Sequence, residues 1–359
     1  MKKRILATLL ALVFAFGILA ACAPDDPPPV PAPATADPEP APAEEPTPAP
    51  EPAPADDDRQ LVLAGVVFQE DQFMRLLTLG FQYAAEAAGA RFVPGNTNGD
   101  AAAEAEMIQT YLVQEFDGLA ISPISEIASF AVLESASAQG LNIGISNHLF
   151  EGPWHVGSYS SDNFNLGFTV GKAAGQYIID NLDGSASIAL VQFRTLLPEQ
   201  SGARSDGFLA GLDYMGVEYD IVTDQCAWMQ DVAIETASAI LSAHPDIDMI
   251  FSANEGGTIG STMAVANTGN AGNVVVFGFD GSEQMVQLLE DPNNILQAVI
   301  AQDPFGIGVL TMEAVIRAAL GQPNPSEGQA IIVPGTLLER ANPAGLTAFV
   351  EDLREKMGS

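Results

Sequence analysis

Short runs of apolar residues, each the length of a buried strand, alternate with helical patterns along most of this chain. The runs cover residues 61–68, 117–123, 141–147, 186–193, 217–224, 248–254 and 273–280. Continuous apolar strands separated by helices are typical of parallel sheets that helices cover on both faces. About ten such units exceed one doubly wound domain and suit two domains of similar size. The sequence therefore predicts an α/β fold with two domains. A single barrel is the alternative, and it requires eight regular repeats.

The first 21 residues have the layout of a secretory signal. Three basic residues precede an apolar run from Ile5 to Ala21, and small residues stand before Cys22. "LAAC" resembles the lipobox of bacterial lipoproteins, which predicts cleavage before Cys22 and attachment of lipid to it. The alternative is an uncleaved anchor helix, although the run is short for a membrane span. Either interpretation places the remaining chain outside the cytoplasm, held at the cell membrane and facing the periplasm or the cell surface.

Residues 22–58 form a segment rich in proline, alanine and acidic residues, with no lysine or arginine. Such a composition buries too little apolar surface to fold, so we predict a disordered stalk. Ten of the 46 acidic residues lie here, and most of the net charge of −33 therefore falls on the body that follows. A body this acidic repels nucleic acid and anionic lipid, so we predict no nucleic-acid partner. Solubility is the simplest explanation of the charge.

Cysteine and histidine are too scarce to build a disulfide framework or a metal centre. If Cys22 carries lipid, Cys226 has no partner for a disulfide. The three histidines are far apart, and no pair of His or Cys residues has the spacing of zinc ligands. We also find no activated nucleophile. The sequence therefore predicts no metal, no cofactor and no enzymatic activity.

Polar residues follow the predicted strands at the points where the strands end. They are Gln69, Glu70, Asp71, Ser122, Asn147, His148, Asn254, Glu255, Asp280 and Gln302. In open parallel sheets, ligands bind beyond the carboxyl ends of the strands. Any single residue of this kind is more often a helix cap, but together they supply amides, carboxylates and an imidazole that suit a hydroxyl-bearing ligand.

Several sequence motifs carry a resemblance to a known family. They are "RSDGF" (204–208), "AHPDIDMIFSANE" (243–255), "VVVFGFDGSE" (274–283) and "AVIAQDPFGIG" (298–308), with looser matches at "GFQYAAEAAG" (80–89), "DGLAISP" (117–123) and "SSDN" (160–163). With these motifs in this order, the body resembles the type I periplasmic binding proteins of ABC importers, in the branch that includes the ribose-binding proteins.

The resemblance implies two Rossmann-like lobes, joined by three crossing strands, that enclose a ligand as they hinge shut. It suggests a first lobe of residues 59–161 plus 303–330 and a second of residues 162–302 plus 331–359. In that fold Gln302 stands at a crossing, which explains why an apolar strand stops at Gln302-Asp303-Pro304. The second-lobe and hinge positions that hydrogen-bond sugar hydroxyls are matched by Arg204, Asn254, Asp280 and Gln302, and Trp228 stands where the family places an aromatic ring.

The first lobe departs from the family pattern. Asp71 and Phe73 match an amide and a ring contact, but Met74 stands where ribose binders carry a second aromatic residue. Ser122 replaces an asparagine, and Asn147 and His148 stand in place of an Asp-Arg pair. These differences argue against ribose itself, and they favour a neutral, polyhydroxylated ligand.

The function that the resemblance implies is binding without chemistry. A monosaccharide or polyol closes the two lobes, and a membrane ABC permease recognises the closed, monomeric protein. One alternative is a sensor that presents a sugar or a sugar-like autoinducer to a membrane kinase or to the chemotaxis system. The other is a carbohydrate-cleaving enzyme, for which Asp71 and Asp280 would have to face each other across the cleft.

Overall fold

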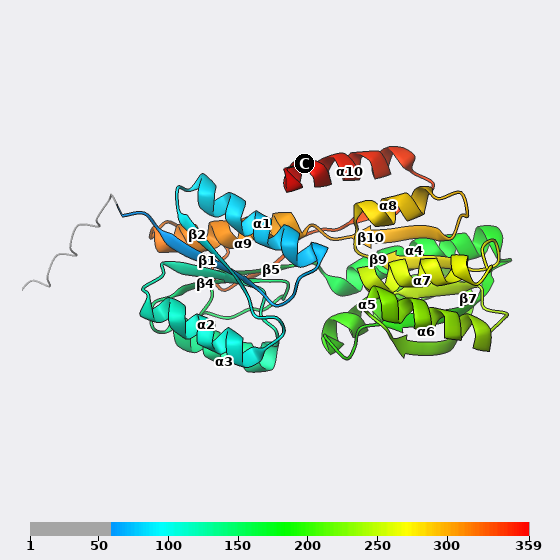
Figure 1. The fold of residues 1–359 in the computed structure, drawn as a ribbon, viewed down its shortest axis with the longest axis horizontal. Coiled ribbons are helices and arrows are strands. Elements are labelled where there is room, and N and C mark those ends of the chain that lie inside the picture. The colour runs from blue at the N-terminus through cyan, green and yellow to red at the C-terminus, as the bar shows by residue number, and fades with distance from the viewer. Residues whose placement is uncertain (1–58, 359) are drawn as a thin grey trace, which may run out of the picture. The chain divides into compact units, whose positions relative to one another are not determined.

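The computed structural model describes residues 59–358, which form two six-stranded sheets covered by helices (Figure 1). The predicted signal peptide, Cys22 and the predicted stalk lie outside the described residues. Within residues 59–358, no helix has the length and apolar character needed to cross a membrane.

The first lobe is built on a wholly parallel sheet with the strand order β11-β5-β4-β3-β1-β2. Its strands are β1 (Val62–Val67), β2 (Arg91–Asn96), β3 (Gly118–Ile121), β4 (Asn142–Ser146), β5 (Gly157–Ser160) and β11 (Ala330–Ile332). One face packs against α1 (Gln72–Ala87) and α9 (Pro304–Ala319). The other packs against α2 (Ala101–Val113) and α3 (Glu126–Ser137). Both faces of this sheet are therefore buried, as its apolar strands require.

The second lobe has the strand order β12-β10-β9-β8-β6-β7. Its strands are β6 (Ser185–Gln192), β7 (Glu218–Cys226), β8 (Met249–Ser252), β9 (Val275–Phe279), β10 (Leu296–Ala301) and β12 (Thr336–Glu339), of which β12 runs antiparallel to β10. The helices α4 (Asn163–Asn181) and α5 (Pro198–Met215) cover one face. The other face carries α6 (Gln230–Ala243), α7 (Glu255–Asn267) and α8 (Glu283–Glu290).

The last helix, α10 (Pro343–Met357), packs against β12 and α8 of the second lobe and also contacts α1 of the first. The residues from 59 onward form four hydrophobic core clusters, two in each lobe. We therefore expect residues 59–359 to fold without the preceding segment.

The two sheets confirm the predicted two-domain α/β architecture, not the barrel. Each of the seven predicted apolar runs overlaps one strand of the structure. The strand β2 was not predicted, because it lies at a sheet edge and carries Pro94 and Gly95, which weaken a strand pattern. The strand β5 was missed because "GSYS" has no apolar run.

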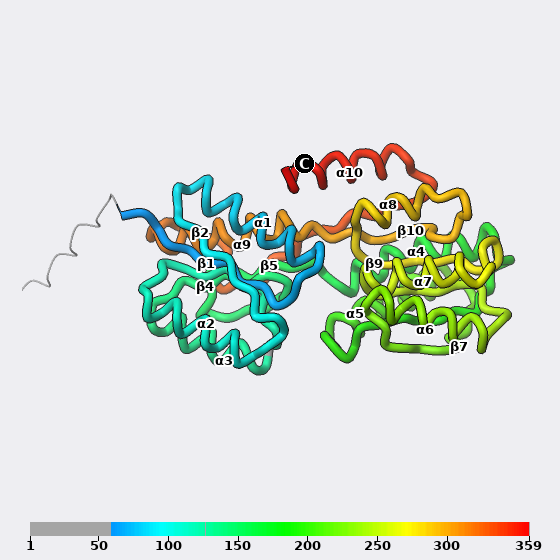
Figure 2. The backbone as a smooth tube through the Cα atoms, in the orientation of Figure 1, coloured from blue at the N-terminus to red at the C-terminus, as the bar shows by residue number. Residues whose placement is uncertain are grey.

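The chain passes between the lobes three times: at residues 161–162, at residues 302–303 and at residues 333–335 (Figure 2). Gln302 lies at the second crossing, immediately after β10. There Asp303 caps α9, because its Oδ1 accepts a hydrogen bond from the Gly306 backbone N–H at 3.0 Å. The family resemblance suggests a border between the lobes after residue 330, which falls at the start of β11. Because Ala330–Ile332 pair with β5 in the first sheet, this strand belongs to the first lobe.

Glycines allow α4 and α5 to pack at very short range. A Cβ atom on Gly207 of α5 would lie 2.1 Å from the Phe164 carbonyl oxygen, and one on Gly171 of α4 would lie 2.2 Å from the Phe208 carbonyl oxygen. Backbone atoms cannot move aside as a flexible side chain can. This contact also brings Arg204 of α5 beside Asn163 at the start of α4.

We predict that Gly207→Ala destabilises residues 59–359 by about 2 kcal/mol or more, because the added methyl group collides with backbone. Thermal unfolding followed by circular dichroism measures the change, and a loss of this size lowers the melting temperature by about 4 °C or more. The matched control is Gly202→Ala in the same helix, where no atom lies within 4 Å of the added Cβ. Because alanine favours helix over glycine, the control should be neutral or stabilising. Equal melting temperatures for the two variants would contradict the tight packing.

A candidate ligand-binding cleft between the lobes

A cleft of about 770 Å³ lies between the lobes, a volume within the usual range for small-molecule sites. Its first-lobe wall comes mainly from the segment that joins β1 to α1, residues 68–74, together with Asn147 after β4. Its second-lobe wall comes from residues that follow β6, β7, β8, β9 and β10. The cleft therefore lies where the carboxyl ends of strands from both sheets meet.

Helix starts fix two polar side chains at this edge. Asp71 is the N-cap of α1, and its Oδ1 accepts from the Met74 backbone N–H at 2.8 Å. Asn254 is the N-cap of α7, where its Oδ1 accepts from the Gly257 N–H at 3.3 Å and its Nδ2 donates to the Trp228 carbonyl oxygen at 2.9 Å. Each cap satisfies a backbone donor that has no partner within the helix, so the sequence holds these side chains in place.

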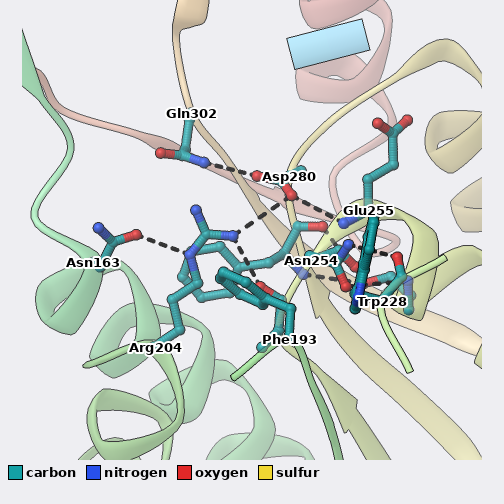
Figure 3. A network of polar contacts seen from close by, with 12 residues as sticks. Asn163, Phe193, Arg204, Trp228, Asn254, Glu255, Asp280 and Gln302 are labelled. Carbon is teal, nitrogen blue, oxygen red and sulfur yellow. Dashed lines mark hydrogen bonds and ion pairs between the residues drawn. The ribbon is translucent and has the colours of Figure 1, made fainter. Parts of the chain in front are cut away.

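Asp280 is the centre of a polar network on the second lobe (Figure 3). It follows β9 with φ of 71°, a left-handed conformation that is uncommon for residues other than glycine. Its Oδ1 accepts from the Gln302 amide at 2.8 Å, and its Oδ2 accepts from the Glu255 backbone N–H at 2.9 Å. The Arg204 guanidinium lies 3.6 Å from the same Oδ2. The unusual backbone therefore turns a carboxylate toward three donors from other segments.

Arg204 is a buried cation, and two of its three guanidinium nitrogens donate hydrogen bonds within the second lobe. Its Nε donates to Asn163 Oδ1 at 2.8 Å, and its Nη1 donates to the Ala253 carbonyl oxygen at 2.9 Å. The guanidinium carbon lies 4.3 Å from the ring centroid of Phe279 and 5.1 Å from that of Phe193. Burial lowers the pKa of Arg204, and the charge of Asp280 acts in the opposite direction. The group remains a cation, since arginine does not lose its proton in proteins.

Glu255, at the start of α7, lines the cleft and has a strongly perturbed carboxyl group. Burial raises its pKa to about 7, against a lowering contribution from the Ser282 hydroxyl, and the charges of Asp280 and Asp71 raise it further. Near neutral pH this carboxyl group is therefore close to half protonated.

Nine of the eleven predicted ligand-binding residues line the cleft, namely Asp71, Phe73, Met74, Asn147, Arg204, Trp228, Asn254, Asp280 and Gln302. Ser122 and His148 do not. Ser122 is fully buried at the end of β3, where its backbone N–H donates to the Val66 carbonyl oxygen at 2.9 Å. The buried ring of His148 is directed to the Pro123 carbonyl oxygen, 3.1 Å from its Nε2.

The predicted ligand-binding set did not include the other lining residues, and Phe193, Gln200 and Glu255 are among these. Phe193 directly follows β6, so the rule that ligands bind beyond strand ends would have found it. Gln200 lies in the first turn of α5, and its amide donates to the Asn147 carbonyl oxygen of the other lobe at 2.8 Å. Nothing in the sequence indicates that contact, since it depends on how the lobes meet.

The fold and cleft define a two-lobed binding protein, and comparison with known proteins supports this class. Residues 65–323 match the family model described as "Periplasmic binding protein domain". The chain belongs to this family. The match confirms the predicted resemblance, and it confirms the prediction of a binding protein in place of an enzyme.

Among curated proteins, the chain is 25% identical to the ABC transporter periplasmic-binding protein YphF of Escherichia coli (strain K12), over 68% of this chain and 75% of that protein. It is 26% identical to the ribose import binding protein RbsB of Bacillus subtilis (strain 168), over 67% and 76% respectively. An ABC transporter solute binding protein from Bacillus halodurans C-125, solved with bound myo-inositol, shares the fold with a TM-score of 0.73 and 16% identity, over 82% of this chain and 99% of that one.

Asp280→Asn tests the polar network without ligand. Because the substitution leaves the buried Arg204 cation without its counter-charge, we expect a loss of about 3 kcal/mol, within the range for breaking a buried ion pair. Urea unfolding of residues 59–359 measures it. Asp220→Asn, at an exposed position of β7, is the matched control and should change the unfolding free energy by less than about 0.5 kcal/mol. If both variants unfold at the urea concentration of the parent protein, Arg204 does not depend on Asp280.

Proposed function

We propose that this chain is the extracytoplasmic substrate-binding component of an ABC importer, and that it captures a monosaccharide or related polyol in its cleft. The observation that carries the proposal is the placement of Trp228 beside the planar polar groups of Asn254, Asp280 and Gln302 on one wall. The names of the relatives agree with it, since they include a ribose import binding protein, a D-allose-binding protein and a xylitol-binding protein.

Sugars combine two kinds of surface, and the cleft offers a partner for each. The C–H face of a sugar ring is apolar and packs on an aromatic ring, a role that we assign to Trp228 and Phe73. The hydroxyls at the rim both donate and accept, as do amides, while carboxylates accept. We assign those contacts to Asp71, Asn147, Asn254, Asp280 and Gln302. Met74 adds an apolar contact, and Arg204 holds Asp280 in position.

The mechanism that we propose is closure of two bodies around the ligand. One body is formed by residues 59–161 with 303–332 and the other by residues 162–302 with 333–359, because β11 pairs with β5 and the suggested border after residue 330 moves to the end of this strand. A ligand that touches both walls is bound better by the closed state and therefore shifts the population toward it. A membrane permease would then recognise the closed form. Affinity in the micromolar range corresponds to about −8 kcal/mol.

The proposed setting is the outer side of the cell membrane. Cleavage before Cys22 and lipid attachment to it would anchor the chain, and residues 23–58 would act as a stalk that leaves the lobes free to meet a permease. We propose that the protein acts as a monomer, because one chain supplies both walls of the cleft.

A thermal-shift screen of residues 59–359 tests the ligand class. The panel holds monosaccharides, polyols, nucleosides and amino acids. A ligand that binds only the folded state raises the melting temperature by mass action, so we expect a shift of several degrees with a carbohydrate. Shifts confined to nucleosides or amino acids would preserve the cleft and overturn the carbohydrate assignment.

Trp228→Ala tests the stacking wall. Because the ring supplies much of the apolar contact with the sugar face, we expect at least about a tenfold loss of affinity, measured by isothermal titration calorimetry with the carbohydrate found in the screen. Tyr214→Ala removes an aromatic ring that is 71% exposed on α5, away from the cleft, and should leave the affinity unchanged. Identical titrations for the parent protein and Trp228→Ala would remove Trp228 from the site.

A further inference from the structure

The cleft carries many more carboxylates than cations. Five acidic residues line it, namely Glu70, Asp71, Asp231, Glu255 and Asp280. Among the described lining residues, Arg204 is the one basic side chain. A neutral sugar would leave this negative charge in place as the lobes close, and like charges repel more strongly when water is removed. The surplus of carboxylates in the walls therefore favours a ligand that carries positive charge.

Arg204 does not supply the missing positive charge. It lies 3.6 Å from Asp280, its Nε and Nη1 already donate to Asn163 and the Ala253 carbonyl oxygen, and two aromatic rings cover its faces. The charges of Arg204 and Asp280 thus offset each other. Among the described lining residues, no cation is left for the other carboxylates of the cleft.

Asp71 and Glu255 differ in how their charge is stabilised. Asp71 caps α1, accepts from the Met74 backbone N–H, and also accepts from the Gln69 amide. The positive end of the helix dipole adds to this stabilisation. Glu255 also lies in the first turn of a helix, α7, and the Ser282 hydroxyl lowers its pKa, but Glu255 forms no ion pair within the described chain and the charges of Asp280 and Asp71 oppose its ionisation. Of these two carboxyl groups, Glu255 therefore gains more from a cation.

Trp228 and Glu255 both line the second-lobe wall of the cleft (Figure 3). The backbone of Trp228 is held against the start of α7, because Asn254 donates to the Trp228 carbonyl oxygen and a Cβ on Gly256 would lie 2.4 Å from that oxygen. A wall that offers both an aromatic ring and a carboxyl group suits a ligand that is both cationic and built on an apolar ring. An ammonium on a sugar or polyol has this chemistry.

We propose that the ligand is an amino sugar or amino polyol whose ammonium group pairs with Glu255. The inference rests on the proposed carbohydrate-binding function and narrows its substrate class. It replaces the neutral ligand that the sequence favours. The ammonium would offset the negative charge of Glu255. It would thereby reduce the repulsion between Glu255 and the carboxylates of Asp280 and Asp71.

Matched sugar pairs test the proposal directly. Isothermal titration of residues 59–359 at about pH 7 compares D-glucosamine with D-glucose, D-galactosamine with D-galactose, and 1-amino-1-deoxy-D-sorbitol with D-sorbitol. We expect the amine of at least one pair to bind at least about tenfold more tightly than its neutral partner, as for a partly buried charge pair. The N-acetyl derivative of the amine carries no charge, so we expect it to bind no more tightly than the neutral partner.

The variant Glu255→Gln keeps the shape of the side chain and removes its charge. It should reduce the affinity for the amine to about that for the neutral partner, and its melting temperature should be no lower than that of the parent protein, because the lost charge is one that burial, Asp280 and Asp71 disfavour. Glu235→Gln is the matched control, because Glu235 is exposed on α6 and does not line the cleft. It removes the same charge from the same lobe and should preserve the preference for the amine.

The pH dependence has a defined sign. The groups that face Glu255 are Asp280 after β9, Asp71 at the start of α1 and Ser282 before α8. Only the ionised Glu255 attracts an ammonium, so the affinity for the amine should fall as the pH drops from about 7.5 to about 5.5, and Glu255→Gln should flatten this profile.

The outcomes separate this proposal from the one on which it rests. If the neutral member of every pair binds as tightly as the amine, and Glu255→Gln changes neither, the ligand is a neutral carbohydrate and this inference is wrong, while the carbohydrate-binding function stands. If no sugar or polyol of either kind binds, the carbohydrate-binding function fails as well.

Discussion

The buried guanidinium of Arg204 connects the parts of the structure that meet at the hinge. It bonds Asn163, which follows the first crossing between the lobes, and it faces Asp280, whose other oxygen accepts from Gln302 at the second crossing. One cation thus links two of the three connections to the wall of the cleft. Burying such a pair costs as much as or more than its attraction returns, so its benefit lies in fixing positions and not in stability. The guanidinium also lies over the rings of Phe193 and Phe279.

The second crossing shows how local sequence places a hinge next to a site. The strand β10 ends at Ala301, Gln302 turns its amide to Asp280, and Asp303 caps the helix that begins at Pro304. Lys356 of α10 reaches the same aspartate, with its Nζ 3.0 Å from Asp303 Oδ1. Gln302, to which we assign a ligand contact, is therefore one peptide bond from the point where the chain changes lobes, and such a contact would couple the ligand to the position of the lobes.

The sequence predicted the fold well because its strongest signal, apolar runs separated by helices, directly reflects sheets buried on both faces. It predicted the second-lobe wall well because strand ends and family motifs coincide at Asn254, Asp280 and Gln302. It did less well on the first lobe. Ser122 and His148 also follow strands, but one is buried beneath the wall and the other turns to a backbone carbonyl, and side-chain direction after a strand is a property of tertiary packing. The charge environment of Glu255 likewise arises from segments distant in sequence, Asp71 and Asp280 among them.

We propose that a ligand bridges the two walls and draws the lobes together. Within residues 59–359 the one cysteine is Cys226, exposed at the cleft end of β7 on the second lobe. Ile127→Cys adds a second label site on the first lobe, at a position that is 90% exposed near the start of α3. Pulsed electron spin resonance then gives the distance between the two spin labels, with and without the carbohydrate that raises the melting temperature most. We predict a distance distribution that shifts to shorter values with ligand. An unchanged distribution at saturating ligand would contradict closure.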